Sequence, residues 1–335
     1  MKKHNHGFCL TLFLATLLPF SRPFAPQILT SRQGKTSLFS QVLEFVEPTT
    51  GVTVKLVGSM HYNPASIKLA QETIEELAES DRLGSVVIES CDLRWETTME
   101  TDPRLQRFLL SEMRAAYDLA LLYNRPLVLG DQRINITTSS MGAGFRQSVM
   151  DLARPIEGWR SFWSNVTEAR EQAVPLGDGY LNAFAFLEPK LLMAAPVSLA
   201  KYPLSYIVKS PVTSLVILSL IFFADSAYAA PIDEMSATDW FGEFMGAALE
   251  TALFSRVFLK ELLVDRNVVL ARNIIEQCKY YQDRPSWRDR FGGRSDAIYA
   301  EGSERPSFKK GKVVVAVLGL AHCNGIKKIL VEKRV

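Results

Sequence analysis

The sequence predicts an α/β protein in which helices flank a central, mostly parallel sheet. Through residue 130, short β-branched runs alternate with segments of helical spacing, in the order strand, helix, strand, helix, strand. This order favours parallel strands joined by helical crossovers. A further β-branched run returns at residues 313–318, and an apolar stretch at residues 191–232 predicts a helical insertion within one domain of residues 41–335.

The first predicted elements are a strand pair and a helix. Residues 41–46 and 52–57 are apolar runs separated by the turn residues Pro-Thr-Thr-Gly. Asn63-Pro64 predicts the start of a helix, because proline fits the first helical turn. The apolar residues that follow recur at helical spacing, at Ile67, Ala70, Ile74 and Leu77.

The next elements continue the alternation. Residues 85–91 form a compact apolar run, as expected of a buried strand. Asp102-Pro103 predicts a long helix that continues to about residue 124, and residues 127–130 predict a short strand.

The second half of the chain is less regular. Residues 139–190 have helical spacing with loops between, and residues 239–277 predict one or two helices. The polar residues 282–311 predict a loop. Residues 313–318 then predict a buried strand, and residues 324–326 predict the start of a short last helix.

Residues 1–40 resemble a targeting presequence and not part of the fold. Lys2 and Lys3 precede an uncharged apolar stretch at residues 8–20, which is short for a bilayer span. Phe24-Ala-Pro then opens a region rich in hydroxyl and basic residues and free of acids. This layout resembles the bipartite plastid presequence of algae with secondary plastids, so we expect a plastid (chloroplast) location. A plain secretory signal or anchor is the alternative.

Charge and cysteine usage argue against two classes of protein. Five of the 38 Lys and Arg lie in the first forty residues, which hold no acid. The rest of the chain therefore has 33 basic residues against 36 Asp and Glu, and is slightly acidic. No basic patch predicts nucleic-acid binding. Beyond Cys9 the cysteines are odd in number and lack a Cys-x-x-Cys pair, which favours a reduced compartment over a disulfide framework.

The apolar stretch contains a candidate membrane segment. Residues 210–224 carry no charge, and the run reaches about 20 residues if it extends through Ala230, which just suffices to cross a bilayer. Membrane association through residues 210–230 and burial of the run as a helical hairpin or surface helix are both open.

Polar residues follow four of the predicted strands. His61 and His322, the only histidines outside the first forty residues, each end a Gly-x-x-His pattern directly after a β-branched run. Glu89 and Asp131 follow two other strands. Because the carboxyl ends of parallel strands share one edge and bind ligands there, these side chains are expected to converge. Two imidazoles and one or two carboxylates are suitable ligands for a divalent metal such as Mn, Co or Zn.

The same residues also have structural explanations. A histidine after a strand usually hydrogen-bonds nearby backbone. Glu89 with Arg94, and Asp131 with Arg133, could be ordinary ion pairs at strand ends.

Five short motifs, in order along residues 50–137 and 260–330, resemble the TraB family, also called TraB/PrgY and related to the Tiki proteases. They are the first Gly-x-x-His with a serine after it, Glu-Ser-Cys with an arginine, Gly-Asp-Gln-Arg, Asp-Arg-Asn, and the second Gly-x-x-His with Gly-Ile after it. Their residues with chemical potential are His61, Glu89, Arg94, Asp131, Arg133, Arg266 and His322.

The resemblance implies an EreA/ChaN-like fold and a divalent-metal-dependent hydrolase, such as a peptidase, that acts on a peptide or small molecule. The two histidines are then metal ligands, Glu89 is a ligand or the general base, and Asp131 orients a histidine or an arginine. Arg94, Arg133 or Arg266 would hold a substrate carboxylate or the developing oxyanion.

Two other functions stay open at this stage. One is a non-catalytic regulatory protein that binds a peptide, or a haem through His61 or His322. The other is a membrane-associated organelle protein, in which the apolar stretch is essential and the histidines are dispensable.

Overall fold

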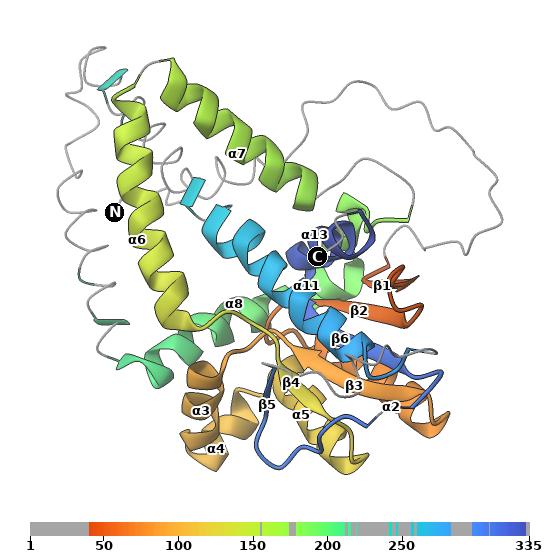
Figure 1. Cartoon of the computed structure of the whole chain (residues 1–335). Coiled ribbons are helices and arrows are strands. Elements are labelled where there is room, and N and C mark those ends of the chain that lie inside the picture. The colour runs from red at the N-terminus through yellow and green to blue at the C-terminus, as the bar shows by residue number, and fades with distance from the viewer. Residues whose placement is uncertain are drawn as a thin grey trace.

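The computed structural model shows a six-stranded sheet with helices on both faces (Figure 1). It describes residues 40–211 except 155 and 174–178, residues 256–332 except 258–259, 283–296 and 308, and the isolated positions 214, 215, 219, 241, 242 and 246. The predicted mixture of helices around a sheet is confirmed. The predicted presequence lies outside the described residues apart from its last position, and it stays a prediction.

The sheet is mixed and not mostly parallel, which corrects the prediction. Its order is β1-β2-β6-β3-β4-β5. The centre is parallel and consists of β2 (Thr53–Ser59), β6 (Val313–Gly319), β3 (Leu83–Ile88) and β4 (Leu127–Leu129). The edge strands β1 (Val42–Val46) and β5 (Ile298–Tyr299) are antiparallel to their neighbours. A tight turn joins β1 to β2, which only antiparallel strands allow, and β5 arises within the segment that the sequence predicted as a loop.

The first hairpin and the first helix confirm their predictions. The carboxylate of Glu47 organises the hairpin turn, because it accepts hydrogen bonds from the backbone N–H groups of Thr49 and Thr50 at 2.9 and 2.7 Å. The helix α2 (Pro64–Glu79) starts directly after Asn63, whose side chain accepts from the backbone N–H of Ala65.

The long helix predicted from residue 102 is wrong. The segment forms α4 (Pro103–Phe108) and α5 (Glu112–Leu122), and a further helix, α3 (Asp92–Glu100), precedes them. Ser111 accounts for the break, since its hydroxyl caps α5 by accepting from the backbone N–H of Arg114 at 3.2 Å. This second helix start places Glu112 in the first turn of α5 with its side chain fully buried.

Alternate residues of the central strands pack into two hydrophobic layers. Val314 and Ala316 of β6 pack with α11 (Asp265–Cys278) and α13 (Leu320–Glu332) on one face. Val313 and Val315 pack with α2 and α5 on the other. This alternation of period two holds the strand ends rigidly in register. The last helix, α13, begins directly after β6 and therefore four residues earlier than predicted.

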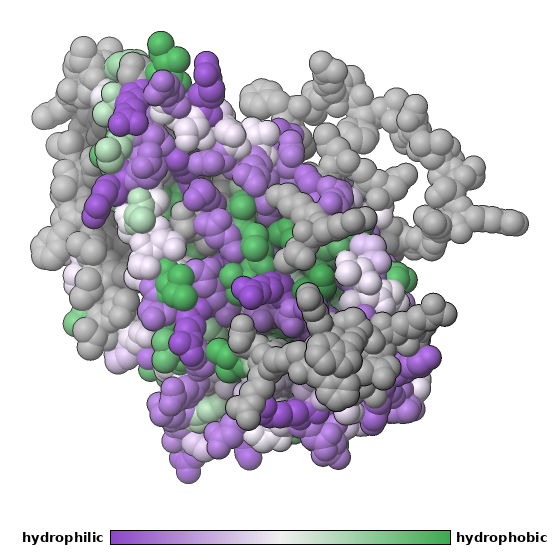
Figure 2. All heavy atoms as spheres, viewed as in Figure 1, coloured by the Kyte–Doolittle hydropathy of each residue, from purple (hydrophilic) through white to green (hydrophobic). Residues whose placement is uncertain are grey.

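The described residues between β4 and residue 209 form a helical excursion. The helices α6 (Ile134–Leu152) and α7 (Glu157–Ala173) reach away from the sheet at the upper left of Figure 1. A 3₁₀ turn, η1 (Ala183–Leu187), and α8 (Pro189–Lys209) follow, and the π-helical turn η3 (Lys260–Val264) precedes α11. On the face seen in Figure 2, hydrophobic residues gather mainly near the middle, with hydrophilic residues around them.

The predicted apolar insertion is helical where the structure describes it. In the described part of the chain, α8 is the one helix whose length and composition suffice to cross a membrane, and 17% of its apolar window is buried. The predicted membrane segment, residues 210–230, lies largely outside the described residues and stays a prediction.

Candidate functional site

The candidate site lies where the parallel strands end. In the sheet register Ser59 pairs with Gly319, and Ile88 pairs with both Val317 and Leu129. The chain therefore leaves all four strands at one edge of the sheet. The residues that follow there include His61, Glu89, Asp131 and His322, so the expected sharing of one edge is confirmed.

Gly319 marks the point where three of the predicted residues meet. A Cβ atom on this glycine would lie 3.2 Å from Oε2 of Glu89, 3.4 Å from Cδ2 of His322 and 3.9 Å from Nε2 of His61. The two Gly-x-x-His patterns thus come together beside one carboxylate. A side chain at position 319 would fill the space between them, which gives the glycine a physical reason.

Glu89 is the centre of this group and is 4% exposed. Its Oε2 accepts from the backbone N–H of Gly319 at 2.6 Å. Its Oε1 accepts from Arg266 at 2.6 Å and lies 3.3 Å from Nε2 of His322. Burial alone would raise the pKa of Glu89, but the charges of His322 and Arg266 outweigh it, so the pKa lies well below its ordinary value. Glu89 is therefore an ionised carboxylate.

His61 is held by a buried acid that the sequence analysis did not single out. Its Nδ1 donates to Oε1 of Glu112 at 2.6 Å, and the other oxygen of Glu112 accepts from the backbone N–H of Tyr62 at 3.1 Å. Burial lowers the pKa of His61, but the hydrogen bond and charge of Glu112, with the charge of Glu89, raise it to about 9. The ring of Tyr202 from α8 stacks on the imidazole, with centroids 6.0 Å apart and planes 13° apart.

His322 lies in the first turn of α13, because this helix begins at Leu320 and not at residues 324–326 as predicted. Its Nδ1 donates to Oδ1 of Asn267 at 2.7 Å, and the amide nitrogen of Asn267 donates to Oε1 of Gln172 at 2.9 Å. These two hydrogen bonds fix the orientation of the Asn267 amide and leave Nε2 of His322 facing Glu89.

Asp131 holds two arginines and no histidine. Nε of Arg266 donates to one oxygen of Asp131 at 2.9 Å, and an amino group of Arg266 donates to the other at 2.5 Å. Arg94 donates to the same carboxylate. The alternative explanation by ion pairs of Glu89 with Arg94 and of Asp131 with Arg133 does not hold, because Glu89 pairs with Arg266 and Asp131 pairs with Arg94 and Arg266.

Arg133 stands outside this group. It pairs with Asp92 at 2.6 Å, and its side chain is 53% exposed. Five of the other predicted side chains belong to one connected set of hydrogen bonds and ion pairs, namely Glu89, Arg94, Asp131, Arg266 and His322. His61 lies beside this set, with its Nε2 3.9 Å from the position of a Cβ atom on Gly319.

Two orienting residues could not be assigned from the sequence. Glu112 lies in a segment predicted as the middle of a helix, and only its position after the capping Ser111 hinted at a helix start. Asn267 was noted as the last position of the Asp-Arg-Asn motif, without a role. Its amide is the acceptor for His322.

The donor set fits a divalent cation in kind. Nε2 of His61, Cδ2 of His322 and an oxygen of Glu89 lie around the Cβ position of Gly319, and Nε2 of His322 lies 3.3 Å from the other oxygen of Glu89. A carboxylate or an amide oxygen accepts from the second nitrogen of each ring. Within the described residues, no group of three His, Cys, Asp or Glu side chains is already arranged around one ion position. Binding would therefore require side-chain movement, most directly of Arg266 away from Glu89.

Comparison with known proteins adds no assignment. No protein-family model matches the chain, and no curated protein matches it.

Proposed function

We propose that this site is the active centre of a divalent-metal-dependent hydrolase, in which His61, His322 and Glu89 hold the metal. The observation that carries the proposal is their convergence on Gly319, at 3.9, 3.4 and 3.2 Å from the position of a Cβ atom there. Two imidazoles beside one carboxylate form the ligand type of catalytic zinc sites and suit manganese and cobalt as well.

The contacts behind the two histidines support the same function. Metal-bound histidines usually donate their second ring N–H to a carboxylate or carbonyl oxygen, which fixes the ring and its tautomer. Glu112 makes this contact to His61, and Asn267 makes it to His322. In both rings Nδ1 is thereby occupied, and Nε2 is the nitrogen left for a ligand.

The approach of His322 to Glu89 is a further argument. With Nδ1 donating to Asn267, Nε2 of His322 lies 3.3 Å from an oxygen of the ionised Glu89. A proton on Nε2 makes this contact an ion pair, and a cation between the nitrogen and the oxygen could take the place of that proton. A shared divalent cation satisfies both groups.

The arginines supply the second part of the proposed chemistry. A divalent metal, when bound, polarises a substrate carbonyl and lowers the pKa of a water. Arg266 is fixed by both oxygens of Asp131 and points at Glu89, so it is placed to hold a substrate carboxylate or a developing oxyanion once it leaves Glu89. Asp131 acts as the positioning residue for Arg266 and Arg94. Arg133 has no part in this proposal.

The resemblance to the TraB family supports the proposal independently of these contacts. The five motifs occur in the family's order, and His61, Glu89, Arg94, Asp131, Arg266 and His322 from them lie at one edge of the sheet. We therefore also propose that the fold is EreA/ChaN-like, with the excursion from α6 to α8 as an addition to it.

Metal analysis of the purified full chain tests the proposal. Wild type is expected to retain one divalent ion after dialysis, and His61→Ala and His322→Ala are expected to lose it. The matched control is the double variant His4→Ala/His6→Ala, which removes the chain's other two histidines and should keep the ion. Equal metal content in all four proteins would refute the metal-dependent function.

A metal-free hydrolase is the second candidate, and the pair of His61 with Glu112 favours it. A buried carboxylate on Nδ1 orients an imidazole for proton transfer through Nε2, as in general acid–base catalysis. Arg266 already neutralises Glu89 in this arrangement without a metal. Hydrolysis that survives a chelator but is lost in Glu112→Gln would select this candidate.

A further inference from the structure

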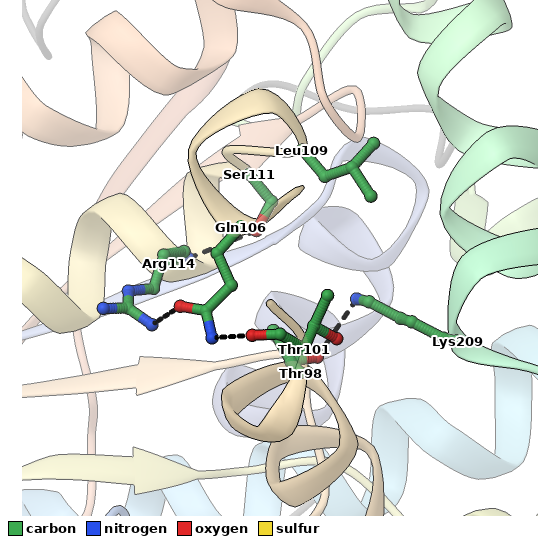
Figure 3. A pocket seen from close by; sticks show the side chains of 7 residues that line it. All are labelled: Thr98, Thr101, Gln106, Leu109, Ser111, Arg114 and Lys209. Carbon is green, nitrogen blue, oxygen red and sulfur yellow. Dashed lines mark hydrogen bonds between the residues drawn. The ribbon is translucent and has the colours of Figure 1, made fainter. Parts of the chain in front are cut away.

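We propose that a hollow between α3, α5 and α8, beside the candidate site, binds an oxyanion group of the substrate, a carboxylate or a phosphate, through the ammonium of Lys209. The proposal deepens the proposed hydrolase function and rests on it only for the statement that the oxyanion belongs to the substrate. Figure 3 shows Lys209 entering the hollow from α8, opposite Thr98 of α3. The hollow is open to solvent, and the space in and in front of it is about 300 Å³. Its lining is Thr98, Thr101, Gln106, Leu109, Ser111, Arg114 and Lys209.

Lys209 has no acidic partner in the part of the chain that the structure describes. Its Nζ donates to the hydroxyl of Thr98 at 3.0 Å, and no carboxylate there lies within ion-pair distance of it. Two of its three N–H donors are thus available to another group. The lining residues contribute hydroxyls, an amide and Arg114, but no carboxylate.

The neighbouring charges also leave Lys209 as a surplus cation. Each carboxylate of the candidate site already has a cationic partner: Glu89 has Arg266, Asp131 has Arg94 and Arg266, and Glu112 has His61. Burial, followed by the positive charge of Arg94, lowers the pKa of Lys209. An oxyanion in the hollow would relieve this repulsion, which is a physical reason for the site to attract one.

The hollow adjoins the candidate site through the start of α5. Ser111 lines the hollow, and the next residue, Glu112, holds His61. The charge of Glu112 acts on Lys209 as well. The proposal thus places the substrate's oxyanion on Lys209 and its neighbouring atoms toward His61, so that the hollow would select substrates that carry a negative group close to the bond to be cleaved.

The test is a titration of the full chain, freed of metal by a chelator, with succinate, inorganic phosphate and the neutral analogue succinamide. The imidazole signal of His61, identified by its loss in His61→Asn, reports binding by NMR. We expect saturable shifts with either or both oxyanions and none with succinamide. Lys209→Met should weaken binding about tenfold or more, as for the loss of one charge-assisted hydrogen bond. Lys209→Arg should retain most of it.

Lys201→Met is the matched control, because Lys201 lies on the same helix with its ammonium over the ring of Phe108. It should bind the oxyanions as wild type does. The proposal is overturned if wild type shows no saturable shift, or if Lys209→Met binds as tightly as wild type. Metal content is measured on Lys209→Met and His61→Ala that have not been treated with the chelator: retention of the metal in Lys209→Met, beside its loss in His61→Ala, separates failure of this subsite from failure of the metal site.

Discussion

Replacement of Glu112 by glutamine is the perturbation whose outcome the structure defines most closely. The amide keeps the size of the side chain but removes the charge, which together with the hydrogen bond is the main cause of the raised pKa of His61. Burial, which lowers that pKa, then prevails. We expect the pKa of His61 to fall from about 9 to below its ordinary value of 6.5.

The raised pKa of His61 also gives the size of its expected contribution to the stability of the fold. The interval from 6.5 to about 9 corresponds to about 3 kcal/mol, and this is an upper bound, because the side chain of His61 is 31% exposed and solvent screens it. Since the folded pKa lies above the unfolded one, wild type has this stabilisation in full below pH 6.5 and loses it as the pH rises through about 9. The difference in unfolding free energy between wild type and Glu112→Gln should therefore be largest in acid and shrink toward pH 9.

The assay combines NMR titration of the imidazole signals with urea unfolding at pH 6 and pH 9. Glu72→Gln is the matched control, because Glu72 is an exposed acid on α2 at 3.6 Å from Lys68. This variant should leave the pKa of His61 unchanged, and its unfolding free energy should differ little from that of wild type at either pH. The reasoning is refuted if His61 of wild type titrates near 6.5, or if Glu112→Gln leaves its pKa near 9.

Four further outcomes are expected. Gly319→Ala should weaken Co²⁺ binding about tenfold by calorimetry, because its Cβ atom would lie 3.2 Å from the carboxylate of Glu89 and 3.4 Å from the imidazole of His322. Gly142→Ala is the control and should leave Co²⁺ binding unchanged, because its Cβ atom would meet nothing within 4 Å. Asn267→Leu should lower metal affinity ~10–100-fold, because it removes the amide that orients His322. Unchanged affinity would count against that role of Asn267. Affinity in wild type should rise between pH 6.5 and 9, as His61 loses its proton, and a pH-independent affinity would contradict its role as a ligand. Leu270→Ala, at a fully buried position of α11, should cost about 2–5 kcal/mol in urea unfolding, and a loss below about 1 kcal/mol would contradict the described packing.

The strands and their ends could be predicted because their signals are local. A β-branched run bounded by turn residues identifies a strand without knowledge of its neighbours, and each such run was found near its predicted position. Once the crossovers made the central strands parallel, the meeting of His61, Glu89 and His322 followed from topology alone.

The predictions failed where one residue, or a contact between residues distant in sequence, determines the structure. The long helix was expected because its apolar spacing continues across Ser111, and spacing does not show that a hydroxyl caps a new helix there. The role of Glu112 depends on packing against a histidine 51 residues away. The ion-pair partners of Glu89 and Asp131 likewise depend on the fold. Each acid has an arginine close to it in sequence, but the fold brings Arg266 against both.

Titration of the metal-free full chain with Zn²⁺, followed at the imidazole signals of His61 and His322, tests the central claim most directly. We predict that both signals change together and are complete at one equivalent, and that His61→Asn abolishes the response of His322. Responses at different Zn²⁺ concentrations, or a response of His322 that survives His61→Asn, would contradict a single ion shared by the two histidines.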